Sequence, residues 1–125
     1  MIVKEVMRTN VICASSDTKA TEVKNMMTEN NVSKLPVVDN GKLVGIVTKN
    51  DLLTKRTVKK IMNTKVISVG PSEVVEEAAR IMVDNKISCL PVVDGDALIG
   101  IITKSDLFHM FTEMFGAREK GVRVV

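Results

Sequence analysis

The sequence predicts an α+β protein made of two similar β-α-β-β-α units packed together as one module. When the chain is shifted by 55 positions without a gap, residues 3–53 align with 58–108, and 22 of the 51 aligned positions are identical. Each copy contains one stretch with apolar residues at helical spacing, followed by two β-rich runs separated by turn residues. Units this short and few do not form a solenoid array, so we expect the two copies to bury a shared face.

The first half of each unit predicts a short strand and then an amphipathic helix. The strand is expected at Val11 and Ile12 in the first copy, and at Val66 and Ile67 in the second. A helix of about three turns is indicated by apolar residues three or four positions apart. These residues are Ala20, Val23, Met26 and Met27, and in the second copy Val75, Ala78, Ile81 and Met82.

The second half of each unit predicts a β-hairpin and a further helix. The hairpin turns are expected at residues 40–42 and 94–96, where glycine lies beside Asn or Asp. Because Asn and Ser are favourable helix N-cap residues, a helix is expected to begin near Asn50 and near Ser105.

The composition is that of an ordinary globular domain, with 45% hydrophobic and 26% charged residues. No apolar run approaches the roughly 20 residues that span a bilayer, and the first residues lack a signal-peptide core, so a cytoplasmic protein without a membrane partner is expected. The formal net charge is only +3, and aromatic residues make up 2% of the chain, which argues against nucleic acid as a partner.

The sequence shows no arrangement of residues typical of an enzyme or a metal centre. The single histidine, His109, lies outside the aligned copies, and no nucleophile recurs with a base at a suitable spacing. Cys13 and Cys89 are isolated and lack the CxxC spacing of a metal or redox site, which favours small buried thiols. We therefore expect no catalytic residues, no metal and no required cofactor.

The pattern G-I-[VI]-T-K-[NS]-D, which ends each copy, points instead to ligand binding. Thr48 and Thr103 end a predicted strand, and Asp51 and Asp106 follow three residues later in the first helical turn. An ionised carboxylate accepts hydrogen bonds and suits a ribose diol, while a helix N-terminus favours phosphate oxygens. The alternative is that these residues only cap the helix.

In its order of elements and its repeated S-x-L-P-V-V-D and G-I-[VI]-T-K-[NS]-D-L motifs, the chain resembles a tandem pair of CBS domains, the Bateman module. The resemblance implies two pseudo-twofold-related domains, at residues 1–55 and 56–110, followed by a tail at residues 111–125. It also implies that the Thr and Asp hold an adenosine-containing regulatory ligand, such as AMP, ADP, ATP or S-adenosylmethionine. A structural dimerisation module without ligand and a nucleic-acid-binding protein remain as alternatives.

In such pairs, the Asp of one repeat faces the first strand and the S-x-L-P turn of the other repeat. The resemblance therefore implies two clefts with aliphatic walls suited to a flat purine. The first joins Ile46, Thr48, Asn50 and Asp51 to Val66, Ile67, Ile87, Ser88 and Pro91. The second joins Ile101, Thr103, Ser105 and Asp106 to Val11, Ile12, Val32, Ser33 and Pro36. Cys13 and Cys89 border different clefts and are expected to be apart and reduced.

The two clefts are expected to be unequal. Lys34 and Cys89 occupy equivalent positions between the serine and leucine of S-x-L-P. A basic residue at this position often reaches the phosphates in related pairs, and by the cross-repeat geometry Lys34 would serve the Asp106 cleft. The Asp106 cleft is therefore expected to be the better phosphate site, unless Lys34 is an ordinary solvated lysine.

The last residues predict a helix with an apolar face and a possible further domain. Phe108, Phe111 and Phe115 lie at helical spacing, and the helix is expected to end at Gly116. Its apolar face would cover either the pair's own core or a partner chain. Residues 116–123 resemble the stretch through which bacterial CBS-pair proteins enter an ACT-like domain, so a truncated chain is one expectation. A homodimer and an effector domain or partner are also implied.

Overall fold

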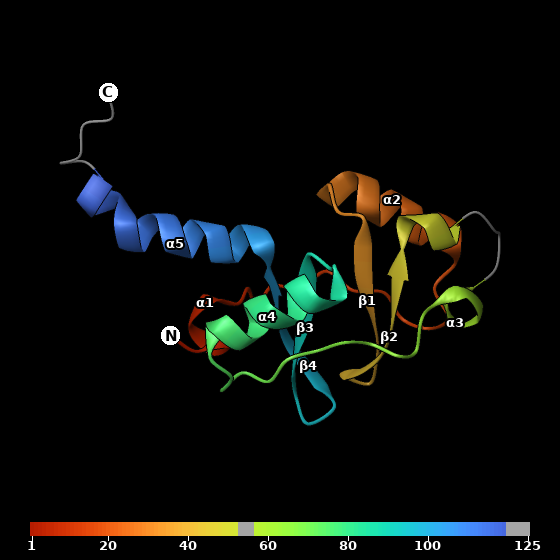
Figure 1. Ribbon diagram of the computed structural model, residues 1–125. Helices are drawn as coiled ribbons and strands as arrows, with labels where there is room; N and C mark the ends of the chain where they lie inside the picture. Colours follow the sequence, from red (N-terminus) through yellow and green to blue (C-terminus); the bar gives the residue numbers. More distant parts are fainter. Residues whose placement is uncertain (53–56, 120–125) are drawn as a thin grey trace.

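The computed structural model describes residues 1–52 and 57–119, and Figure 1 shows how their elements are arranged. The elements in chain order are α1 (Val3–Val6), α2 (Ala20–Asn30), β1 (Lys34–Asp39), β2 (Lys42–Thr48), the 3₁₀ helix η1 (Lys49–Leu52), α3 (Val58–Ile61), α4 (Val75–Asn85), β3 (Cys89–Asp94), β4 (Ala97–Thr103) and α5 (Lys104–Glu119). The mixture of helices with an antiparallel sheet confirms the α+β class.

The strands form one four-stranded antiparallel sheet in the order β1-β2-β4-β3, so each repeat supplies one hairpin. The two hairpins are joined only at their turns, where Lys42 lies opposite Ala97. Close to this pair, the Leu43 N–H donates to the Asp96 carbonyl at 2.9 Å. Because there is no further pairing between β2 and β4, the hairpins spread apart from their joined turns, as Figure 1 shows.

Both hairpin turns confirm the sequence prediction. Asn40 and Gly41 both have positive φ angles, of 52° and 80°. Two positive φ angles in succession match the right-handed twist of the flanking strands, and an Asn-Gly pair tolerates them. In the second hairpin Gly95 alone takes a positive φ, of 64°.

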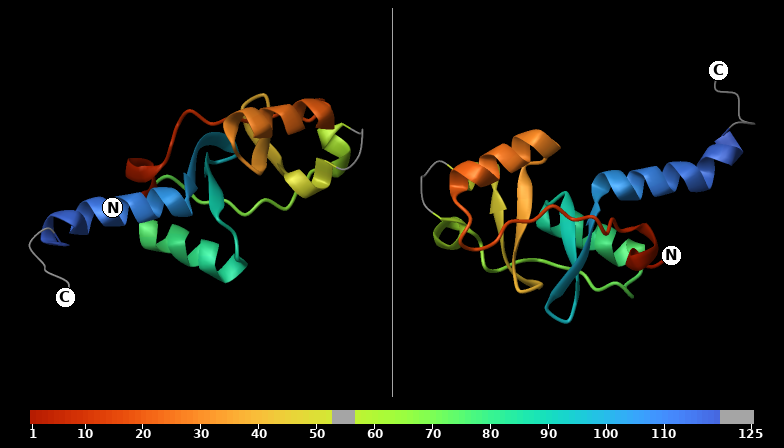
Figure 2. Two further views of the ribbon diagram at one scale, coloured as in Figure 1. Left: turned by 90° about the horizontal axis from the view of Figure 1, so that it is seen from above. Right: turned by 180° about the vertical axis from the view of Figure 1, so that it is seen from behind.

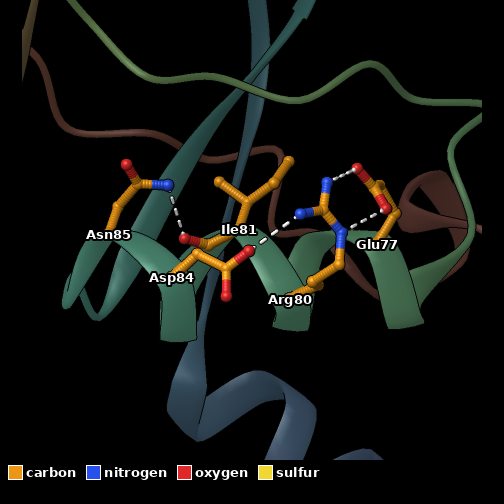
Figure 3. A network of polar contacts seen from close by, with 5 residues as sticks. All are labelled: Glu77, Arg80, Ile81, Asp84 and Asn85. Carbon is orange, nitrogen blue, oxygen red and sulfur yellow. Dashed lines mark hydrogen bonds and ion pairs between the residues drawn. The ribbon is translucent and has the colours of Figure 1, made fainter.

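The two predicted amphipathic helices are also confirmed, as α2 and α4, each of 11 residues. Each buries three apolar residues at helical spacing, namely Ala20, Val23 and Met27 in α2, and Val75, Ala78 and Met82 in α4. The exposed side of α4 carries an ion-pair network, drawn in Figure 3, in which Arg80 binds Glu77 and lies 2.8 Å from Asp84. Pairs at this spacing on an exposed face add little stability, so burial of the apolar side is what holds each helix in place.

The short helices α1 and α3 are exchanged between the repeats. Val3, near the start of the chain, is buried in the second repeat's core with residues such as Met82 and Leu90. Val58 in turn is buried in the first repeat's core, with residues such as Met27 and Leu35. Figure 2 shows the N-terminal end of the chain beside α4 and α5 rather than beside α2. Each hydrophobic core is therefore completed by a helix from the other half of the sequence.

The predicted first strand of each repeat is wrong in position. Neither Val11 and Ile12 nor Val66 and Ile67 belong to a strand. The backbone instead makes an isolated parallel bridge a few residues later, where Ala14 pairs with Val37 and the Ala14 N–H donates to the Pro36 carbonyl at 3.0 Å. The matching bridge in the second repeat is at Val69. The buried side chains here are Ala14 and Val69. Neither belongs to the adjacent apolar pairs, at residues 11–12 and 66–67, that predicted the strand.

The helices after the hairpins also differ from the sequence prediction. In the first repeat, the described residues that follow β2 form the 3₁₀ helix η1, which begins at Lys49, next to the expected Asn50. In the second repeat α5 begins at Lys104 rather than Ser105, and it continues through Gly116 to Glu119 instead of ending at the glycine. A single glycine lowers helix propensity by only about 1 kcal/mol, which does not end a helix by itself. Of the stretch 116–123 that resembles the entry to an ACT-like domain, residues 116–119 belong to α5 and the rest lies outside the described residues.

Candidate functional site

The repeated Thr and Asp residues lie at the junction between a strand and the following helix. In the second repeat, the Asp106 N–H donates to Thr103 Oγ1 at 3.1 Å, and the Thr103 N–H donates back to Asp106 Oδ2 at 3.0 Å. This reciprocal pair is a capping box, so Thr103 takes the N-cap role that Ser105 was expected to play. Thr103 and Asp106 thus have the helix-capping role that was the alternative to ligand binding.

The first repeat has a related but different junction. Both the N–H and the hydroxyl of Thr48 donate to Asp51 Oδ2, each at 2.9 Å. The junction is also tied to the S-x-L-P turn of its own repeat, because the Lys49 N–H donates to the Ser33 carbonyl at 2.9 Å. These bonds fix where Thr48 lies at the end of β2.

Two cavities lie at these junctions, and each is lined by both repeats. The first, of about 210 Å³, is lined by Lys34, Ile46, Thr48, Asn63, Lys65, Val66, Ile67, Ile87 and Cys89, and we call it the Asn63 cavity. The second, of about 340 Å³, is lined by Arg8, Asn31, Val32, Ser33, Lys34, Ser88, Cys89, Ile101, Thr103, Lys104 and Ser105, and we call it the Arg8 cavity. A cavity shared between two repeats is where their relative position can respond to a bound molecule.

Many of the residues expected in each cleft are brought together. The Asn63 cavity gathers Ile46, Thr48, Val66, Ile67 and Ile87, and the Arg8 cavity gathers Val32, Ser33, Lys34, Ile101, Thr103 and Ser105. Val32 and Ile67 each remain 39% exposed, so each cavity has an apolar side chain open to solvent.

Other expected residues do not line their cavity. Asn50 and Asp51 are absent from the Asn63 cavity, and Val11, Ile12 and Asp106 are absent from the Arg8 cavity. Ile12 packs on the first repeat's core instead. Pro36 and Pro91 are buried as the third residues of β1 and β3, and Ser88 lines the Arg8 cavity rather than the one expected.

An ion pair explains why Asp106 does not face the Arg8 cavity. The Nε of Arg8 lies 2.8 Å from Asp106 Oδ1, and the Asp106 side chain is only 9% exposed, compared with 66% for Arg8. The guanidinium therefore covers the carboxylate that was expected to bind ribose. Sequence reasoning missed Arg8 because it lies 98 residues from Asp106. The available signal was the 55-residue repeat, which pairs Arg8 with the uncharged Asn63.

Lys34 and Cys89 lie between the two cavities, since each of them lines both. Lys34 thus lines the cavity beside Asp106, where it was expected, and lines the Asn63 cavity as well, while its role toward a ligand stays a prediction. Burial raises the pKa of the Cys89 thiol, and the nearby Lys34 ammonium partly opposes this increase. Cys89 and Cys13 are both free thiols.

Within residues 1–52 and 57–119, no three His, Cys, Asp or Glu side chains gather as a metal site would require. None of the helices in the same part of the chain has the length and apolarity needed to cross a membrane.

Two sequential repeats that exchange helices and share two cavities define a paired module. The family model of the CBS domain matches twice, at residues 3–56 and 58–113, and the chain belongs to the CBS domain family as a tandem pair.

Similar proteins differ in size and in the ligands with which they have been solved. The chain is 38% identical over 120 residues to an inosine-5'-monophosphate dehydrogenase of Korarchaeum cryptofilum, covering 92% of this chain but only 25% of that enzyme. The CBS domain pair of protein MJ0100, solved with 5'-methylthioadenosine and S-adenosyl-L-methionine, has a TM-score of 0.81 and 33% identity, over 91% of this chain and 98% of that one. CBSX2 of Arabidopsis thaliana, solved with AMP, has a TM-score of 0.85 and 28% identity, over 90% and 97%.

Proposed function

We propose that this CBS pair is a regulatory module that binds an adenosine-containing ligand in the Arg8 and Asn63 cavities. The observation that carries the proposal is that both repeats line each cavity, at the junction where a Thr and an Asp follow the central strands. A ligand that bridges the repeats can change their relative position, which is what a regulatory module needs. The two similar pairs solved with AMP and with S-adenosyl-L-methionine support this class of ligand.

The chemistry of the cavity walls agrees with an adenosine-containing ligand. Solvent-exposed aliphatic side chains, Val32 in one cavity and Ile67 in the other, offer apolar surface for a purine. Cations line both cavities and can bind phosphate or another anionic group. The module is proposed to regulate rather than to catalyse, acting on an effector domain or on a separate partner.

A ligand screen tests the proposal directly. Thermal unfolding of the full chain is measured with AMP, ADP, ATP, S-adenosylmethionine and 5'-methylthioadenosine at increasing concentration. A ligand at about 100 times its Kd stabilises the folded state by about 2.7 kcal/mol. If none of these ligands shifts the unfolding temperature, a structural module without ligand is the better interpretation. Binding to DNA or RNA that falls steeply with salt would instead favour the nucleic-acid alternative.

We also propose that the module forms a homodimer through the second repeat. An apolar groove of about 430 Å³ lies between α4 and α5, where Val83, Phe108 and Phe111 are exposed. The equivalent of Val83 in the first repeat is Thr28, and the equivalent of Ala79 is Lys24, so the matching face of α2 is polar. With the apolar face on one repeat only, a twofold contact buries it in both copies and closes at the dimer.

The oligomeric state tests this second proposal. Val83→Asp is expected to convert the dimer to a monomer in sedimentation or light scattering, because it places a charge in the apolar interface. Thr28→Asp, on the corresponding face of α2, is the matched control and is expected to remain dimeric. A wild-type chain that is monomeric at high concentration would contradict the proposal.

A further inference from the structure

Arg8 and Asn63 occupy equivalent backbone positions in the two halves of the molecule. The N–H and carbonyl of Arg8 each bond to Ile101 at 2.9 Å. Asn63 makes the same two bonds to Ile46, at 2.8 and 2.9 Å. The two residues therefore enter their cavities from the same direction, and the difference between them is confined to the side chain.

The carboxylates of Asp106 and Asp51 have different hydrogen-bond partners. Both oxygens of Asp106 are engaged, because Oδ2 accepts from the Thr103 N–H while Oδ1 accepts from Arg8. At the first junction, beside the Asn63 cavity, both bonds from Thr48 go to the same oxygen of Asp51, and Asp51 has no ion pair with any described residue. The side-chain oxygen of Asn63 accepts from the Lys65 N–H at 3.0 Å. A ligand hydroxyl thus competes with a cation for Asp106 but with no described cation for Asp51.

We propose that Arg8 makes its cavity selective for adenosine ligands with an anionic 5' group, and that the other cavity, which has Asn63 in place of this guanidinium and is lined by Lys34 and Lys65, discriminates less strongly between anionic and uncharged adenosyl ligands. This inference rests on the proposed function and assigns a different charge preference to each site. Arg8 is a specificity-determining residue that binds Asp106 in this structure and pairs with the anionic group of a bound ligand.

The selectivity follows from what happens to the guanidinium on binding. A ribose that bonds to Asp106 displaces Arg8, whose backbone stays fixed to Ile101, so the charge remains inside the cavity. A 5'-phosphate gives this guanidinium a new bidentate partner, whereas uncharged adenosine leaves it unpaired. S-adenosylmethionine would add a second positive charge beside it. Lys104 lines the Arg8 cavity as well and strengthens the preference for an anion.

The cavity sizes point in the same direction. The Arg8 cavity, at about 340 Å³, has room beyond that of the Asn63 cavity, at about 210 Å³. A phosphorylated ligand is larger than its parent nucleoside. The larger cavity is also lined by more cations, namely Arg8, Lys34 and Lys104, compared with Lys34 and Lys65 in the smaller one.

The test exchanges the two side chains. Calorimetry with AMP and with adenosine is carried out on the full chain in an Asp51→Ala background, which leaves the Arg8 cavity as the intact site. Adding Arg8→Asn is expected to reduce the preference for AMP over adenosine by about tenfold or more, by weakening AMP binding and strengthening adenosine binding. In an Asp106→Ala background, Asn63→Arg is expected to increase the preference for AMP over adenosine in the other cavity.

The controls separate charge from folding and from the proposed function itself. Arg8→Lys keeps the charge and is expected to retain a preference for AMP, while Arg80→Asn removes a charge from the outer face of α4 and is expected to change neither affinity. If Arg8→Asn changes both affinities by the same factor, or neither, the inference is overturned although the proposed function stands. If the wild-type chain binds no adenosine ligand, both fail together.

Discussion

Gly100 in β4 lies directly against Met7, so that a Cβ atom added at the glycine would be 2.5 Å from the Met7 Sδ and 2.9 Å from the Arg8 carbonyl oxygen. The first contact involves a flexible side chain, but the second involves backbone that is bonded to Ile101. Because that backbone cannot move without breaking the bridge, Gly100 is required by close approach rather than by its φ angle.

Gly100→Val is therefore expected to destabilise the fold by about 1–3 kcal/mol or more, as overpacking does. Chemical denaturation measures the change in the free energy of unfolding. Gly70→Ala is the matched control, because the nearest atom to its added Cβ is a Glu73 side-chain carbon at 3.8 Å. Equal stability of the two variants would show that Met7 and Arg8 can move aside.

Removing either carboxylate is expected to weaken nucleotide binding in one cavity only. Asp51→Ala should affect the Asn63 cavity and Asp106→Ala the Arg8 cavity, as measured by calorimetry. Because each carboxylate also bonds to the N–H of its Thr, each variant is expected to lose about 0.5–2 kcal/mol of stability. Asp→Asn at the same positions keeps an acceptor for that N–H and removes the charge, which separates capping from ribose binding. Normal binding by both alanine variants would contradict the ribose assignment.

Lys34→Ala is expected to weaken the binding of phosphorylated ligands in both cavities, because Lys34 lines both. A charge-assisted bond to phosphate contributes roughly 1.5–3 kcal/mol, so the expected loss is about tenfold or more per cavity. Adenosine provides the control, since it has no phosphate to lose. A loss confined to the Asp106 cleft would restore the original sequence-based expectation for this lysine.

The Cys89 thiol is expected to report on ligand binding. Its pKa is raised by burial, so a smaller fraction of it is the reactive thiolate than for an ordinary thiol at the same pH, and its alkylation should be slower. Because Cys89 lines both cavities, a bound nucleotide should slow alkylation further, whereas Cys13, which lines neither, provides an internal control. Peptide mass spectrometry follows both residues in one sample. Equal slowing of the two cysteines by nucleotide would indicate general stabilisation instead.

The sequence was most informative where structure depends on local chemistry. The hairpin turns followed from Asn and Gly side by side, and α2 and α4 followed from apolar residues repeating at helical spacing. The strand expected at Val11 and Ile12 is not formed, because two adjacent apolar residues do not determine which nearby residue pairs with the sheet. The bridge formed at Ala14, where Val37 lies opposite.

The candidate site was predicted in outline but not in its electrostatics. The repeat and the family resemblance brought Thr48 together with Val66 and Ile67 in one cleft, and Thr103 with Val32 and Ser33 in the other. Neither gave the ion pair between Arg8 and Asp106, since the repeat marks Arg8 only as different from Asn63 and does not show that it contacts a residue 98 positions away. The sharing of Lys34 between the cavities likewise depends on how closely the two halves approach.

The exchange of α1 and α3 has a consequence for the origin and the unfolding of the molecule. A single repeat expressed alone lacks the buried valine that completes its core. Val58, for example, belongs to the second repeat in sequence but packs in the core of the first. Two identical single repeats could supply this helix to each other, so the duplication joins in one chain what two short chains would make by exchanging a helix. In the present chain, neither core can open without disrupting the other, and melting should follow one cooperative transition rather than two.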